Sequence, residues 1–410
     1  MKDLKPILDP PDLILRYRDD PEAVAKKYPK SSQLIRPLFN LYQKIRHLSQ
    51  AQAKKVITES LSYDVGKRIE KGRIYEEFTR AISAAKDFRQ SIIREFVPDA
   101  LRFPFTSDGV VNPIVDPVIL LRMMWEPPGD PRYATRRSFL ANVFWNLGLR
   151  YFVMRLENTY PEKHLSDLTL WFERELFITA NATEDQHYLE TALISYDPDN
   201  ANRYVESLPL TVSQTGQNCL NLMLGYRFIK VGNRVVRCLY DSRVKQEADI
   251  FRKVLSKSQA EKPVAHDTCA ISFVFFSEED LRVGFEALTD RIFTNSAMIY
   301  NLRHRSRHGK SHNDFTGGDA PPELQFLVYA LGGIIEVQIF LFPNYFNRRF
   351  SLGDENHHLY RTRQIQPILN CLFPTELYLD WNDQTIQKML KEMQLQKIRT
   401  NFEGFVLPQL

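Results

Sequence analysis

The apolar segment from Leu324 to Phe342, LQFLVYALGGIIEVQIFLF, limits the possible folds of this chain more than any other stretch. Its length suits a membrane-spanning helix. However, Gly332 and Gly333 divide it into two runs that are rich in β-branched and aromatic residues, and such a pair supplies the positive φ angles of a tight hairpin turn. Glu336 would also be costly in lipid. The segment therefore predicts a hairpin of two buried strands, and no membrane partner.

The residues before this hairpin alternate between strand and helix patterns. RVVRCLY (234–240) and TCAISFVFF (268–276) are typical of strands. RVKQEADIFRKVLSK (243–257) favours a helix, as does SEEDLRVGFEALTDRIF (277–293), which opens on a capping serine and acidic residues. Strand–helix–strand–helix followed by a hairpin predicts a mixed β-sheet with flanking helices.

The N-terminal half has a different pattern. Apolar residues recur at helical spacing from Ser32 to Phe96, which predicts about three helices, and again from Ser138 to Leu156. Residues 1–30 contain several prolines and are predicted to form an irregular arm. The predicted class is α+β, with a helical N-terminal domain (1–215), an α/β domain (216–380), and a C-terminal helix and tail (381–410).

Composition excludes little. The net charge of +4 permits an anionic partner without requiring one. The four cysteines form no C-x-x-C pair, so a reducing compartment is favoured over a disulfide framework or a cysteine zinc site. The first residues, MKDLKPILDPPDLIL, have no continuous apolar core of a signal peptide, and we expect a cytoplasmic protein.

Three cations at the start of the predicted helix 243–257 are spaced to meet a chain of phosphates: Arg243, Lys245 and Lys253. Lys245 and Lys253 are eight residues apart and share a helical face. Asp249 lies between them and can pair with either, which favours an ordinary solvated helix face. Both interpretations stay open on these residues alone.

Two acidic residues are candidates for metal binding. Strand alternation places Glu336, Gln338 and Phe340 on one face, and a charge in a central strand needs a cation or metal partner. Asp267 stands at the start of the strand 268–276, where it can also serve as a turn or cap residue. Two carboxylates on neighbouring strands would hold Mg²⁺, with phosphate oxygens completing its shell.

The order of these parts resembles a known family. A strand, the R-V-K-x4-I-x-R-K helix, a D-x-x-A-I strand, a helix, a basic loop and an E-V-Q-I strand together resemble the synthetase domain of RelA/SpoT-type alarmone synthetases, over about residues 230–375. The resemblance implies a nucleotidyltransferase-like fold. It also implies a pyrophosphokinase, a transferase that moves the β,γ-pyrophosphate of ATP onto a 3′-hydroxyl.

The resemblance also implies roles for individual residues. Arg243 would stack on adenine, and Lys245 and Lys253 would hold the ATP phosphates. Asp267 and Glu336 would bind Mg²⁺, and Glu336 would help to deprotonate the acceptor hydroxyl.

This chain departs from the family at three places. Ser272 and Phe340 stand where the family has arginine, and APPELQ (320–325) stands where the family has G-Y-x-S-L-H. The acceptor is therefore expected to be a nucleotide or RNA other than the usual GTP or GDP. The alternatives are a catalytically inactive synthetase that serves as a nucleotide sensor or protein-interaction module, and a plain interaction protein.

Two further basic segments are candidates for contacts with the acceptor or its phosphates. One is NLRHRSRHGKSHND (301–314) and the other is ENHHLYRTRQ (355–364). For both, a solvated surface is the competing interpretation. The candidate contact residues are Arg305, Arg307, Lys310, His358 and Arg361.

Overall fold

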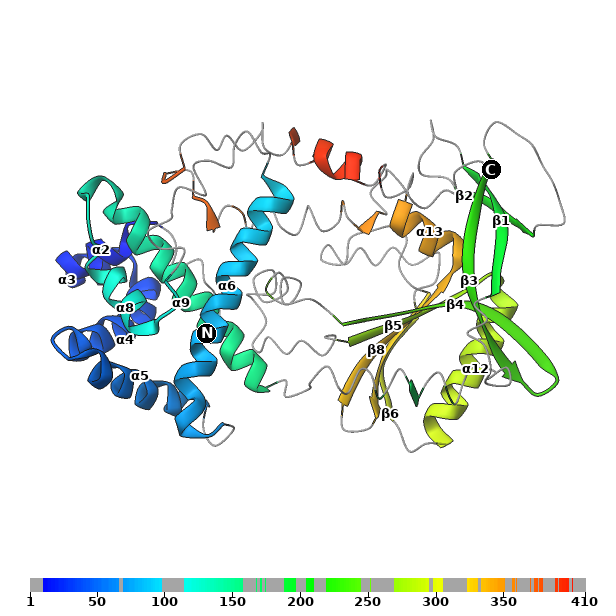
Figure 1. Ribbon diagram of the computed structural model, residues 1–410, viewed down its shortest axis with the longest axis horizontal. Helices are drawn as coiled ribbons and strands as arrows, with labels where there is room; N and C mark the ends of the chain where they lie inside the picture. The colour runs from blue at the N-terminus through cyan, green and yellow to red at the C-terminus, as the bar shows by residue number, and fades with distance from the viewer. Residues whose placement is uncertain are drawn as a thin grey trace. The chain divides into compact units, whose positions relative to one another are not determined.

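The computed structural model divides the chain into two compact units (Figure 1). Unit 1 comprises residues 1–159, 246–265 and 364–390, and unit 2 comprises residues 160–245, 266–363 and 391–410. Each unit is described by itself. The structure describes residues 10–65, 69–97, 114–157, 188–196, 204–209, 219–244, 251, 269–294, 298–304, 323–330, 333–350, and isolated positions within 167–174 and 356–400.

Unit 1 is helical throughout its described N-terminal part. Its α-helices are α2 (Leu13–Asp19), α3 (Pro21–Lys27), α4 (Pro29–Ile45), α5 (Gln50–Val65), α6 (Ile74–Phe96), α8 (Pro117–Trp125) and α9 (Ala134–Glu157), and its short 3₁₀ turns are η2 (Lys71–Arg73) and η4 (Pro131–Tyr133). The predicted helices between Ser32 and Phe96 and between Ser138 and Leu156 are thus confirmed.

The prediction of an irregular arm over residues 1–30 is wrong for the part that the structure describes, because α2 and α3 lie there. The prolines do not prevent helix formation, since Pro21 and Pro29 occupy the first turn of a helix, where no backbone N–H donor is needed. Asp20 caps α3 by accepting a hydrogen bond from the backbone N–H of Ala23 at 2.9 Å.

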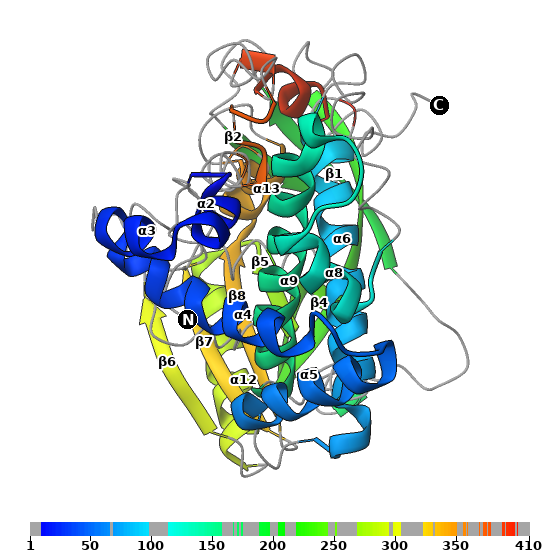
Figure 2. The ribbon, with the colours of Figure 1, turned by 90° about the vertical axis from the view of Figure 1, so that its left-hand side faces the viewer.

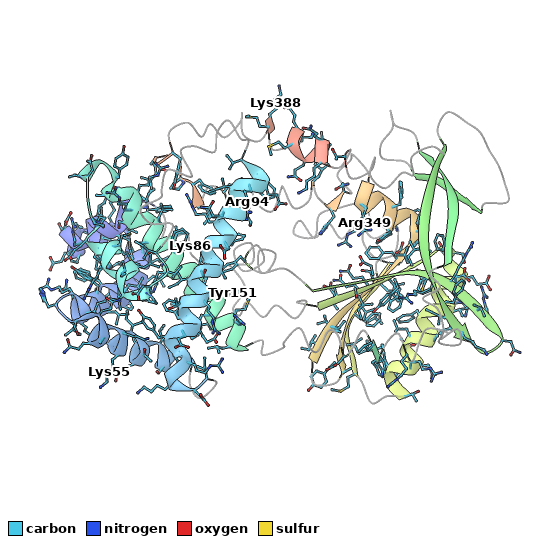
Figure 3. The ribbon with its side chains drawn as sticks, viewed as in Figure 1. Lys55, Lys86, Arg94, Tyr151, Arg349 and Lys388 are labelled. Carbon is cyan, nitrogen blue, oxygen red and sulfur yellow. The ribbon has the colours of Figure 1, made fainter. Side chains whose placement is uncertain are left out.

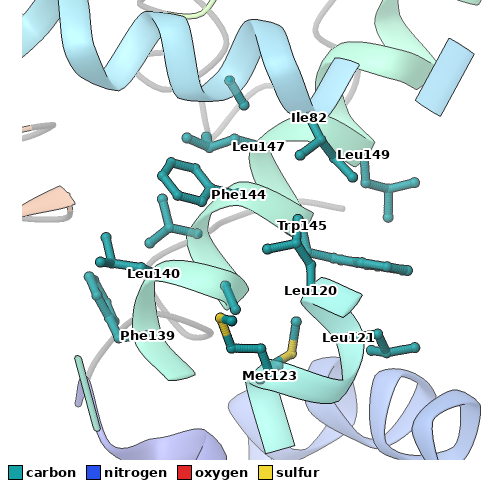
Figure 4. Close-up of a cluster of buried hydrophobic side chains, with 14 of the residues drawn as sticks. Ile82, Leu120, Leu121, Met123, Phe139, Leu140, Phe144, Trp145, Leu147 and Leu149 are labelled. Carbon is teal, nitrogen blue, oxygen red and sulfur yellow. The ribbon is translucent and has the colours of Figure 1, made fainter. Parts of the chain in front are cut away.

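Helices α6, α8 and α9 enclose the core of unit 1, and Figure 2 shows α6 and α9 side by side. The core contains large side chains such as Phe144, Trp145 and Leu120 (Figure 4). α6 and α9 approach closely at Gly148, where an added Cβ atom would lie 2.7 Å from Cγ1 of Ile82. Helix α8 ends at Trp125.

Unit 2 is built on an eight-stranded sheet with the order β2-β1-β3-β4-β5-β8-β7-β6. Its strands are β1 (Tyr188–Tyr196), β2 (Tyr204–Pro209), β3 (Cys219–Val231), β4 (Arg234–Val244), β5 (Cys269–Phe275), β6 (Met298–His304), β7 (Leu324–Ala330) and β8 (Gly333–Leu341). Among the described strand pairs, β5 and β8 are parallel and the others are antiparallel. The predicted mixed sheet and the hairpin of two buried strands are confirmed.

Helix α12 (Glu278–Thr294) covers one face of this sheet. Its start is capped as predicted, because the backbone N–H of Asp280 donates to Ser277 Oγ at 3.1 Å. Val283, Leu288 and Ile292 pack against buried residues of β4, β5, β7 and β8. At Gly284 the helix touches the sheet so closely that an added Cβ atom would lie 2.2 Å from Cζ of Phe275.

Two predicted boundaries differ from the structure. Strands β1 and β2 precede residue 216 but belong to the sheet of unit 2. The predicted helix 243–257 begins too early, because Arg243 and Val244 continue strand β4 and pair with β5. The described positions between 391 and 397 are helical, as expected near the C-terminus.

In the part of the chain that the structure describes, no helix is long and apolar enough to cross a membrane.

Candidate functional site

Glu336 lies in the middle of the sheet. Its strand, β8, is flanked by β5 on one side and β7 on the other, so the residue has strand neighbours in both directions. Only 4% of Glu336 is exposed. The expectation that this carboxylate belongs to a central strand, rather than to an edge strand that faces water, is confirmed.

The two faces of the sheet differ in chemistry. Alternate residues of β8, Val337 and Ile339 among them, join the apolar core under α12. The residues between them face the other side, where one cross-strand row of partners is polar. We call it the polar row, and its members are Asp241 of β4, Ser272 of β5, Gln338 of β8 and Gln325 of β7.

The carboxylate of Glu336 is held by this row. Oε1 of Glu336 accepts hydrogen bonds from the side-chain amides of Gln338, at 3.0 Å, and Gln325. Both of these donors are neutral amides. Amide donors replace the hydrogen bonds that a carboxylate makes with water.

Arg243 is brought into register with Glu336. Arg243 pairs with Ala270 on β5, and Ala270 pairs with Glu336 on β8. Neighbouring strands are about 4.8 Å apart, so the backbones at 243 and 336 are separated by about 10 Å. The small Ala270 is the residue between them. This pairing places a predicted phosphate-site cation and the predicted metal-site acid in one cross-strand row.

Helix α13 (Phe342–Phe350) follows β8 directly and adds two arginines that the sequence analysis missed. Arg348 Nη1 donates to Gln338 Oε1 at 3.5 Å, and its guanidinium lies 5.1 Å from the ring centroid of Phe340. Arg349 pairs with Asp241 at 3.7 Å and lies 5.1 Å from the ring centroid of Tyr345. Figure 3 shows Arg349 on this helix.

The last turn of α13 therefore brings guanidinium groups to two members of the polar row. Arg349 contacts its β4 member and Arg348 contacts its β8 member. The site so defined has two carboxylates, two amides, one serine and two arginines, on strands and a helix of unit 2. In the sequence, this site is indicated by an Arg-Arg pair that begins eight residues after Phe340. The direction in which these two side chains point, however, depends on how the chain turns from β8 into α13.

Two departures from the family pattern also lie on this side of the sheet. Ser272 is 8% exposed and belongs to the polar row. Phe340 is 1% exposed, and its ring meets Tyr345 edge-on at 5.8 Å. Phe340 thus packs in the protein and provides the aromatic face for Arg348.

The remaining predicted site residues lie outside the described residues. These are Lys245, Lys253, Asp267, Arg305, Arg307, Lys310, His358 and Arg361. Within the described ranges, no group of three or more His, Cys, Asp or Glu side chains is arranged to hold a metal ion.

Comparisons of the chain with models of protein families, with curated proteins and with solved structures found no match.

Proposed function

We propose that unit 2 is a nucleotidyltransferase-like domain that uses ATP and Mg²⁺ to transfer pyrophosphate to a 3′-hydroxyl of a nucleotide or RNA acceptor. The observation that carries the proposal is Glu336, a nearly fully buried carboxylate on the polar side of a central strand parallel to β5. Burying a carboxylate is costly, and the apolar core of the sheet does not require one. A buried acid in such a position is therefore more typical of a functional site than of a packing role.

The register supports a nucleotide site beside Glu336. Positions 243 and 336 both pair with Ala270, from the two sides of β5. In the proposal, Arg243 contacts adenine, while Lys245 and Lys253 hold the triphosphate. Glu336 and Asp267 are the protein ligands of Mg²⁺, which would supply charge neutralisation for the phosphates.

The proposed reaction is an in-line displacement at phosphorus. The 3′-oxygen of the acceptor bonds to the β-phosphorus of ATP, the bond from that phosphorus to the α,β-bridging oxygen breaks, and AMP leaves. The hydroxyl proton passes to the carboxylate of Glu336. Such transfers depend mainly on positioning and on electrostatic stabilisation.

The acceptor residues of the proposal come from the two basic segments. Arg305, Arg307 and Lys310 would contact acceptor phosphates, and His358 and Arg361 would contact the nucleotide. RNA fits these segments because phosphate contacts from arginine and lysine supply most of the affinity for nucleic acids.

The test uses ATP labelled at both the β- and γ-phosphates, with Mg²⁺ and a panel of nucleotide and RNA acceptors. Both labels should move together to the acceptor while AMP forms in equal amount. Glu336→Gln should lower the rate by about 10²-fold or more. The matched control is Glu286→Gln, which changes a mainly exposed acid on α12 and should keep the wild-type rate. If no acceptor produces AMP, the enzymatic proposal is rejected.

One observation favours a second candidate, a catalytically inactive nucleotide sensor. Ser272 and Phe340 replace the family's arginines, and Phe340 is packed against Tyr345. Calorimetry separates the candidates: tight ATP binding that is lost in Lys245→Ala, without AMP formation, would support the sensor.

A further inference from the structure

We infer that Arg348 of α13 is a phosphate-binding residue of the proposed nucleotide site. The inference rests on the proposed function and adds a substrate contact from a helix that the sequence motifs do not include. The guanidinium of Arg348 contacts both the amide of Gln338 in the polar row and the aromatic ring of Phe340 on β8.

Gln338 connects Arg348 to the acid of the site. Its amide nitrogen donates to Glu336 Oε1 at 3.0 Å, and its amide oxygen accepts from Arg348 Nη1 at 3.5 Å. One side chain therefore separates the guanidinium from the carboxylate. A triphosphate is longer than the amide group of Gln338. A metal-bound triphosphate at Glu336 would therefore extend from the carboxylate as far as the guanidinium of Arg348.

Packing fixes the direction of Arg348. Its guanidinium lies over the ring of Phe340, a residue that is 1% exposed and held by Tyr345. A cation over a buried aromatic ring is stabilised by about 0.5–2 kcal/mol. A guanidinium held in this way is preorganised, so less entropy is lost when its planar fork binds two phosphate oxygens.

The neighbouring Arg349 is the natural comparison. Its guanidinium faces the carboxylate of Asp241, and about half of each side chain is exposed (49% and 45%). Arg348 instead contacts the side chain of Gln338, which itself donates to Glu336, and the ring of Phe340. Because these contacts direct its guanidinium towards the acid of the site, we assign phosphate binding to Arg348 and a surface ion pair to Arg349. During transfer, Arg348 would stabilise the charge on the migrating pyrophosphate.

The test is titration calorimetry of the full chain with Mg²⁺ and α,β-methylene-ATP, an analogue that cannot release AMP. Arg348→Ala should weaken binding about tenfold to 100-fold at unchanged stoichiometry, the range expected for loss of a charged hydrogen bond. Arg348→Lys keeps the charge and the aliphatic stem but not the fork, and should weaken binding about tenfold. If the alanine variant does not fold, the Arg348→Lys variant still tests whether Arg348 binds phosphate.

Arg282→Ala on the opposite side of the sheet is the control for net charge, since Arg282 is 63% exposed and pairs with Glu286. It should bind like the wild-type protein, and Arg349→Ala should lose less affinity than Arg348→Ala. Unchanged affinity in both Arg348 variants, or an equal loss in Arg282→Ala, would overturn the inference about Arg348 and leave the proposed function intact. A wild-type protein that binds no analogue would instead overturn the proposed function.

Discussion

Both units of the chain bury polar side chains, but they arrange them differently. In unit 1, three buried polar side chains are tied within a helical core to particular partners. Arg89 donates to the hydroxyl of Tyr378 at 2.9 Å, Asn146 donates to Asn142 at 2.7 Å, and Ser138 donates to a backbone carbonyl. In unit 2 the polar row, Glu336 and two arginines gather on one face of a sheet.

This difference separates two uses of polarity. A hydrogen bond between a buried polar group and a particular partner offsets part of the cost of burying that group and helps to define a unique fold. The sheet of unit 2 already has an apolar face under α12 for its core, so folding does not require an acid, amides and arginines to converge on the opposite face. We expect polar substitutions in unit 1 to change stability and those in unit 2 to change binding.

The largest effect on stability is expected for Arg89→Ala in unit 1. Arg89 is fully buried, donates to Tyr378, and lies 4.8 Å from the ring centroid of Phe373. Removing it leaves a cavity and breaks the buried hydrogen bond to Tyr378, which should lower the free energy of unfolding by about 3 kcal/mol. Urea unfolding followed by tryptophan fluorescence measures this, because Trp125 and Trp145 are buried in the same core.

Arg80→Ala on the same helix is the matched control. Arg80 is 61% exposed and pairs with Glu77, so its loss should change the free energy of unfolding by about 0.5 kcal/mol or less. The comparison between the units fails if Arg89→Ala keeps full stability but abolishes nucleotide binding, because unit 1 would then contain the chemistry.

The next effect tests whether the apolar face of the sheet stabilises unit 2. Gly284→Ala places a methyl group against the ring of Phe275, which is itself 1% exposed. This overpacking should destabilise the protein by about 1–3 kcal/mol in urea unfolding followed by circular dichroism. Gly72→Ala is the control, because an added Cβ atom there meets nothing within 4 Å. Equal effects of both substitutions would contradict the tight contact between α12 and the sheet.

The sequence predicted the parts of unit 2 whose patterns are local. Gly332-Gly333 between apolar runs indicated the β7–β8 hairpin, and Ser277 followed by acids indicated the start of α12. Alternation in β8 assigned Glu336 and Val337 to opposite faces, and the registers agree. In each case neighbouring residues along the chain determine the structure.

Other features depend on contacts between distant segments and could not be predicted in this way. Strands β1 and β2 have no strong alternation, and they are defined by the pairing of β1 with β3 and of β2 with β1. Arg243 continues β4 because it pairs with β5, although its local sequence favours a helix. The contact of Arg348 with Gln338 depends on how α13 folds back from β8. The site therefore contains one predicted acid, Glu336, and arginines that only the fold identifies.

A matched pair of serines sharpens the comparison at a smaller scale. In unit 1, Ser138 donates to the carbonyl of Met124, one of the last carbonyls of α8, which lack helical partners. Ser138→Ala should lower the free energy of unfolding by about 1–2 kcal/mol. In unit 2, Ser272→Ala in the polar row should change it by about 0.5 kcal/mol or less and should instead alter affinity for α,β-methylene-ATP. Urea unfolding and calorimetry on both variants check this, and the reverse order of stability losses would contradict it.

The last prediction concerns Tyr42→Phe in unit 1, whose effect on stability depends on pH. Burial, and the hydrogen bond to Glu126, raise the pKa of the Tyr42 hydroxyl from 10.0 to about 12. Because the folded-state pKa is the higher one, the folded protein holds this proton more tightly than the unfolded chain. The resulting stabilisation is fully present below pH 10 and is lost as the pH rises towards 12. Urea midpoints of wild-type protein and Tyr42→Phe, measured at pH 9 and pH 11.5, should therefore converge, since other titrating groups are common to both. A difference between the midpoints that does not depend on pH would show that Tyr42 is not the buried, singly tied polar group that distinguishes unit 1.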